Sequence, residues 1–141
     1  MRQTLKHILS QHLQVMEHDY KCLDLSVRPW NEMQIHSLET LRTSLRRLRD
    51  TVSKTTVSES PISVAMRQDI YNQLAIIGGF VQILLDRQVG EVGLAATTSL
   101  EKILNEGRNM KDALEADKAQ IPPSTEVSIP RYNWALAPNK S

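Results

Sequence analysis

The stretch HSLETLRTSLRRLRDTV, residues 36–52, has the clearest helical period in the chain. Its apolar residues recur in alternating steps of three and four, which places them on one narrow seam of a helix. Seams of this kind are typical of helices that pack side by side in coiled coils and bundles. The sequence therefore predicts a helix here and a second helix against it. The seam residues are Leu38, Leu41, Leu45, Leu48 and Val52.

Apolar residues in the preceding segment predict a helix from Leu5 to Leu23. It should stop before SVRPWNE, residues 26–32, because proline disfavours helical geometry in the residue before it. The next helix is then expected to start near Trp30, since proline can itself open a helix. The inward residues expected in the first helix are Leu5, Ile8, Leu9, Leu13, Met16, Tyr20 and Leu23.

Two further helices are predicted after the polar linker VSKTTVSESP, residues 52–61. The third should run from Pro61 to about Arg87, with Ser60 as its N-cap and Gly90 as a stop. The fourth should begin at residues 93–95 and end near residue 119. Their inward residues are Met66, Ile70, Leu74, Ile77, Val81 and Leu84, followed by Leu100, Ile103, Leu104, Met110 and Leu114.

Composition agrees with an all-α protein. The 141 residues are 40% hydrophobic and 4% aromatic, a balance that favours helix formers over strand formers. A net charge of +1 gives no electrostatic reason to expect nucleic acid or a membrane as partner. The longest apolar run, residues 74–85, is shorter than the ~20 residues that span a bilayer. The single Cys22 cannot form an intramolecular disulfide, so we expect a cytoplasmic protein.

These elements suggest two antiparallel helical hairpins, over residues 1–57 and 58–120, followed by a proline-rich tail over 121–141 that we expect to be extended or disordered. An isolated hairpin buries too little apolar surface to be stable alone. The second hairpin is therefore predicted to complete a four-helix bundle by homodimerisation. The alternative is that the first hairpin completes the bundle within one chain.

A polar cluster interrupts the apolar third helix. Gln68 lies about two residues off the stripe defined by Ile70 and Leu74, so its side chain should face solvent. Asp69 and Asn72 lie three apart on a neighbouring exposed strip. These residues can therefore face a partner together.

The stretch RQDIYNQLAIIGGFVQILLD, residues 67–86, resembles the phosphoacceptor helix of sensor histidine kinases. The motif of that helix runs His, acidic, Ile or Leu, two variable residues, Pro or Gln, Leu, then Ile, x, Gly, aromatic. GEVGLAATTSLEKILNEGRNMKDAL, residues 90–114, is similar to the antiparallel second helix of the same hairpin. The resemblance covers roughly residues 61–117. The positions that match are Asp69, Ile70, Asn72, Gln73, Leu74, Ile77, Gly79 and Phe80.

The resemblance implies a dimeric four-helix bundle that binds the receiver domain of a response regulator. In the family, the acidic residue after the histidine assists as a base, and the polar residue four positions after the histidine orients water for dephosphorylation of the receiver. Asp69 and Asn72 occupy these positions. With Gln68 and Gln73 they form the candidate binding set.

One position departs from the family. Gln68 stands where the family has its phosphorylated histidine, and an amide lacks the nucleophilic ring nitrogen that accepts a phosphoryl group. No glycine-rich phosphate loop occurs in the sequence, and we expect no ATP-dependent kinase activity, no cofactor and no metal.

Three functions stay open from the sequence. The first is a two-component regulator that docks a receiver and has possible phosphatase activity. The second is a histidine phosphotransferase whose acceptor is replaced by Gln68. The third is a structural coiled-coil adaptor, in which Asp69 and Asn72 are ordinary exposed helix residues.

The histidines offer weaker candidates. His36 begins HSLETL, which weakly resembles a phosphotransfer motif but has Glu39 and Thr40 where that motif has lysine and glycine. Bulk and negative charge there would oppose an acidic receiver pocket. No carboxylate or cysteine completes a metal set with the first-helix histidines, which are His7, His12 and His18.

Arginines flank the second helix beside its seam. They could receive a phosphate or an acidic partner, but a charged ridge of this kind is usually solvated. We interpret it as a solvated surface. Its members are Arg42, Arg46 and Arg49.

Overall fold

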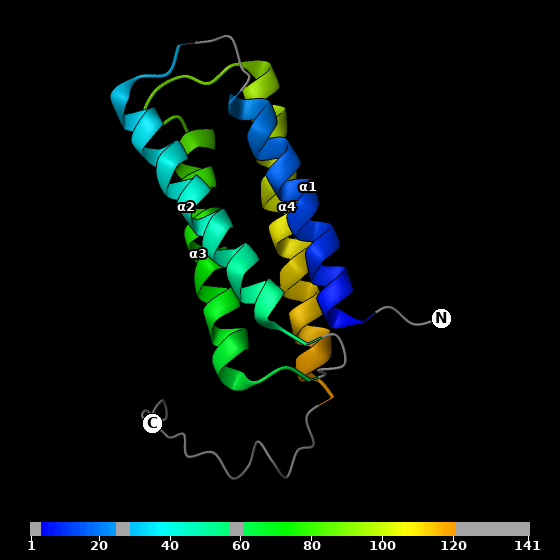
Figure 1. The fold of residues 1–141 in the computed structure, drawn as a ribbon. Helices are drawn as coiled ribbons and strands as arrows, with labels where there is room; N and C mark the ends of the chain where they lie inside the picture. The colour runs from blue at the N-terminus through cyan, green and yellow to red at the C-terminus, as the bar shows by residue number, and fades with distance from the viewer. Residues whose placement is uncertain (1–3, 25–28, 57–60, 121–141) are drawn as a thin grey trace, which may run out of the picture.

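The computed structural model describes residues 4–24, 29–56 and 61–120, and within them every regular element is an α-helix. Four helices run alternately up and down beside one another (Figure 1). The all-α prediction is therefore confirmed for the described residues. The predicted tail, 121–141, and the predicted boundary between residues 57 and 58 lie outside them. The helices are α1 (Leu5–Asp24), α2 (Glu32–Lys54), α3 (Val64–Leu85) and α4 (Leu94–Lys118).

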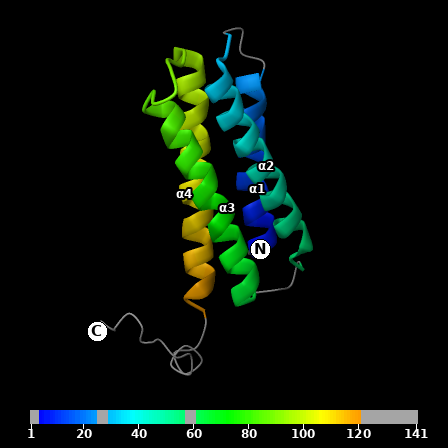
Figure 2. The same cartoon turned by 90° about the vertical axis from the view of Figure 1, so that its left-hand side faces the viewer.

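Each helix packs against two neighbours. α1 lies between α2 and α4, and α3 lies between α2 and α4 on the other side, as Figures 1 and 2 show from two directions. One hydrophobic cluster joins side chains from all four helices. The bundle is thus closed by a single chain, as the intramolecular alternative anticipated. Homodimerisation requires a second copy of the chain and stays a prediction.

The core follows the predicted seams closely. All five seam residues of α2 are buried, and so are all of the predicted α1 positions except Ile8, which is half-buried. In α3 and α4 most residues of the predicted stripes are buried, while Met66, Leu74 and Leu104 are half-buried and pack against the core. None of the described helices has the length and apolar content needed to cross a membrane.

The start of α3 differs from the prediction. Ser63 is the N-cap, and its hydroxyl accepts a hydrogen bond from the Met66 amide at 3.2 Å. Pro61 therefore precedes the helix, and Ser60 lies outside the described residues. The physical reason is Ile62, which is 2% exposed and has to reach the core before the helix can begin. α3 also ends at Leu85 rather than Arg87.

At the opposite end of the bundle, the first turn of α2 holds the loop between α3 and α4. Asn31 caps α2 in a capping box with Gln34. The Asn31 Nδ2 group donates to the Val89 carbonyl at 2.7 Å, and Gln34 Nε2 donates to the Glu91 carbonyl at 2.8 Å. The start of α2 is thereby fixed to the loop between α3 and α4. This contact also explains why α2 begins at Glu32, two residues after Trp30.

Candidate functional site

The first turns of α3 carry the predicted polar cluster. Gln68 and Asn72 are both exposed, and Gln68 Nε2 donates to Asn72 Oδ1 at 3.3 Å. They lie one turn apart on the side of α3 that faces away from the core. The two amides therefore form one outward-facing pair.

Asp69 points instead toward α2. Its Oδ2 atom accepts a hydrogen bond from the Thr51 hydroxyl at 2.7 Å, although the residue is exposed overall. This contact ties the last turns of α2 to the first turns of α3. Asp69 is thus held by α2 beside the outward-facing amide pair.

Gln73 does not join the surface. It is only 7% exposed, and its Oε1 atom accepts no hydrogen bond from the described residues. Its position on the helix explains this, because residue 73 lies one turn from the buried Ile70 and Ile77. The candidate binding surface is therefore Gln68, Asp69 and Asn72.

A shallow hollow of about 480 Å³ lies between the end of α2 and the start of α3. Sequence patterns missed the contribution of α2, namely Thr51 and Lys54. A short linker between two helices predicts that they pack antiparallel, and this signal could have placed the end of α2 beside the start of α3. The lining residues are Thr51, Lys54, Ala65, Met66, Gln68, Asp69 and Asn72.

The polar groups of this hollow can recognise a ligand through charge and hydrogen bonds. Its lining combines one ammonium, one carboxylate and two amides, while its one hydroxyl already donates to Asp69. The Lys54 ammonium and the amide N–H groups can bind an anionic oxygen, and an amide can orient a water molecule. None of the lining residues is an imidazole or a thiol.

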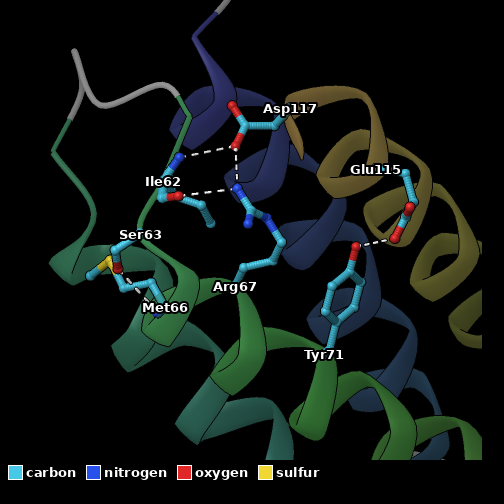
Figure 3. Close-up of polar contacts among 7 residues, drawn as sticks. All are labelled: Ile62, Ser63, Met66, Arg67, Tyr71, Glu115 and Asp117. Atoms are coloured by element: carbon cyan, nitrogen blue, oxygen red, sulfur yellow. Dashed lines mark hydrogen bonds and ion pairs between the residues drawn. The ribbon is translucent and has the colours of Figure 1, made fainter. Parts of the chain in front are cut away.

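A buried ion pair fixes the chain just before the site, as Figure 3 shows. The side chains of Arg67 and Asp117 are 6% and 2% exposed, with 3.5 Å between Arg67 Nη2 and Asp117 Oδ2. The same Asp117 oxygen accepts from the Ile62 amide at 3.0 Å, and Arg67 donates to the Ile62 carbonyl at 3.1 Å. The last turn of α4 therefore sets where α3 begins.

One turn beyond this pair, the Tyr71 hydroxyl donates to the Glu115 carboxylate (Figure 3). Partial burial and this hydrogen bond raise the pKa of Tyr71 from 10.0 to about 12. The folded state therefore favours the protonated phenol.

This pKa shift predicts a loss of stability at high pH. Because the folded pKa is the higher one, the contribution of Tyr71 is complete below pH 10 and is lost as the pH rises toward 12. Urea unfolding at pH values across this range should show the free energy of unfolding of the wild-type chain falling toward that of Tyr71→Phe. A constant difference between the two proteins would contradict the assignment, and phenolate absorbance in the folded chain gives an independent reading.

The other candidates from the sequence lie away from this site. His36 is exposed in the first turns of α2, at the opposite end of the bundle. On α1, His12 Nδ1 lies 2.6 Å from Glu106 Oε1 on α4, and the His18 ring lies 3.9 Å from the Cys22 sulfur. Within the described residues, no group of three or more His, Cys, Asp or Glu side chains could hold a metal ion.

The arginine flank of α2 is exposed, and one member has a structural partner. Arg49 Nε donates to Glu17 Oε2 of α1 at 2.6 Å, and a second bond joins Arg49 Nη2 to the same carboxylate. Arg42 and Arg46 are exposed. Arg49 therefore contributes to the contact between α1 and α2.

Comparison of the chain with protein-family models, with curated proteins and with solved structures found no significant match.

Proposed function

We propose that this protein is a two-component signalling regulator that docks a receiver domain through the surface formed by Gln68, Asp69 and Asn72, without ATP-dependent kinase activity of its own. The observation that carries the proposal is the presentation of the Gln68 and Asn72 amides to solvent at the start of α3. By resemblance to sensor histidine kinases, this is where the hairpin meets a receiver. The resemblance itself rests on residues 61–117.

The electrostatics of the site suit such a partner. The phosphorylation pocket of a receiver is acidic, and Lys54 supplies a positive charge at the edge of the hollow. The acidic Asp69 is already engaged by the Thr51 hydroxyl, which lowers the electrostatic cost of bringing it near another carboxylate. In this arrangement the Asn72 amide is the group that orients water toward an aspartyl phosphate, so docking is accompanied by phosphatase activity.

The fold supplies a rigid platform for this contact. Hydrogen bonds to Asp117 of α4 and Thr51 of α2 fix the start of α3. A preorganised surface loses little conformational freedom on binding, which favours affinity. In the alternative, a histidine phosphotransferase whose acceptor is replaced by Gln68, this hollow would accept no phosphoryl group as the chain stands, because none of its lining side chains is an imidazole.

Two substitutions test the proposal. Asp69→Arg places a longer side chain across the docking surface and removes the Thr51 contact that holds residue 69 against α2. This steric and structural loss should outweigh the added positive charge, which by itself would favour an acidic receiver. We expect it to weaken receiver binding by about tenfold or more, equivalent to roughly 1.4 kcal/mol. Asn72→Ala is expected to leave most of the affinity but to slow receiver dephosphorylation by about tenfold to a hundredfold. Calorimetry measures receiver binding, and the decay of a phosphorylated receiver measures dephosphorylation.

Asp112→Arg is the matched control, because Asp112 is exposed on α4 and undergoes the same change of charge. It should bind and dephosphorylate receivers as the wild-type chain does. The proposal fails if Asp69→Arg and Asn72→Ala also behave like the wild-type chain toward receivers that it binds, or if the wild-type chain binds none of the host's receivers.

A further inference from the structure

The outward face of α3 continues well beyond the docking surface. Its exposed residues recur in steps of four, three, four, three and four, which is the spacing of a helix seam. Figure 2 shows that α3 lies on the outside of the bundle, with its neighbours to either side. We call this row the outer seam. It consists of Gln68, Asn72, Ala75, Gly79, Gln82 and Asp86.

The outer seam carries almost no charge. No residue from Ile70 to Leu85 is charged, which is unusual for a solvent-facing strip of helix. Small residues, Ala75 and Gly79, occupy the middle, and polar residues occupy both ends. Two hollows between α3 and α4 border the seam. The smaller, of about 540 Å³, is lined mainly by apolar groups including Leu74 and Leu104, and the larger, of about 750 Å³, is lined mostly by polar and charged side chains. The face is therefore suited to a close contact that is small at its centre and uncharged along most of its length.

The seam is also symmetric about position 77. Gln68 donates to Asn72 at one end, and Gln82 Nε2 donates to Asp86 Oδ1 at 2.9 Å at the other. In each pair a glutamine amide bonds to a side-chain oxygen one turn later. An antiparallel second copy, related by a twofold axis at position 77, would therefore set small residues against small residues and polar residues against polar residues.

We propose that a second copy of this chain docks on the outer seam, with the two α3 helices antiparallel. A twofold interface sets one patch against itself, so a charged patch would oppose like charges, whereas this one does not. In this register Ala75 faces Gly79 of the second copy, Asn72 faces Gln82, and Gln68 faces Asp86 over a length of about 27 Å. The central contacts are small with small, and the outer ones are amide with amide and amide with carboxylate.

This contact differs from the homodimerisation expected from the resemblance, in which a second copy completes the bundle core. In this chain α1 and α2 already fill that place. One consequence rests on the proposed function: the outer seam includes Gln68 and Asn72, so self-association and receiver docking exclude one another.

Sedimentation equilibrium of the full chain over a concentration series tests the proposal. The wild-type chain should show a monomer and dimer equilibrium. Gly79→Arg and Ala75→Glu should each raise the dimer dissociation constant by about tenfold or more, because each places two like charges near the centre of the interface. A Cβ atom at residue 79 meets nothing within 4 Å, so the monomer accommodates a side chain there.

The register is tested by mixing the two variants. An equimolar mixture should recover dimers, since the new cation at residue 79 then faces the new carboxylate at residue 75 of the other chain. Ala116→Arg, an exposed change on α4, is the control and should dimerise like the wild type. A monomeric wild-type chain at every concentration, or wild-type dimerisation by Gly79→Arg, would overturn the interface. A mixture that stays monomeric would overturn the antiparallel register. None of these outcomes depends on a receiver.

Discussion

Asp117→Ala is expected to lower the free energy of unfolding by about 3 kcal/mol, because it removes one partner of a buried ion pair. The Arg67 guanidinium would stay buried without its countercharge, and its Nε atom already lacks a hydrogen-bond acceptor among the described residues. The Ile62 amide would lose its acceptor at the same time. Urea unfolding followed by circular dichroism measures the change.

Asp112→Ala controls for the loss of a carboxylate from α4, since Asp112 is exposed, and it should change stability by less than about 0.5 kcal/mol. A similar small effect for Asp117→Ala would mean that the ion pair does not anchor the start of α3. The expected loss matters for function as well, because the docking surface begins one residue after Arg67.

Gly90→Ala should destabilise the opposite end of the bundle by about 2 to 3 kcal/mol, through backbone strain and a disturbed helix cap. Gly90 has a φ of 130°, a backbone conformation that residues other than glycine rarely adopt. A Cβ atom there would lie 2.7 Å from Asn31 Nδ2 and 3.0 Å from Gln34 Nε2. Both amides are already fixed by the capping box and by the loop carbonyls, so neither can move away without losing hydrogen bonds.

Gly107→Ala is the matched control for this substitution. Gly107 lies inside α4, where a Cβ atom would make ordinary contacts of 3.9 Å with Met16 and 4.0 Å with Leu74. Alanine is the better helix former, so this variant should gain about 0.5 to 1 kcal/mol. Thermal melts of both variants check the pair, and a Gly90→Ala protein as stable as the wild type would contradict the role given to this loop.

The helices could be predicted from the sequence because the core of a bundle repeats with the helical period. The seam of α2 shows this best, since each of its five predicted residues is buried. Gln73 shows the limit, because the family resemblance included it in the binding set although residue 73 lies one turn from the buried Ile70 and Ile77. At such a flank the helical geometry outweighs the polarity of the side chain.

Contacts between distant segments could not be predicted from local patterns. The start of α3 is set by Asp117, which is 55 residues away from Ile62, so the choice between Ser60 and Ser63 as N-cap depends on tertiary packing. For the same reason the sequence indicated Gln68 and Asn72 but not Thr51 and Lys54. Their place in the hollow follows from the antiparallel packing of α2 against α3.

The most direct test of receiver docking is to map where a receiver touches the chain. An isotope-labelled sample is titrated with each receiver domain of the host, with and without a phosphoryl mimic, and the amide signals are followed by nuclear magnetic resonance. We expect at least one receiver to shift the signals of Gln68, Asn72 and Lys54 and to leave those of the exposed face of α1 unchanged. Shifts confined to α1, or no shift with any receiver, would contradict it.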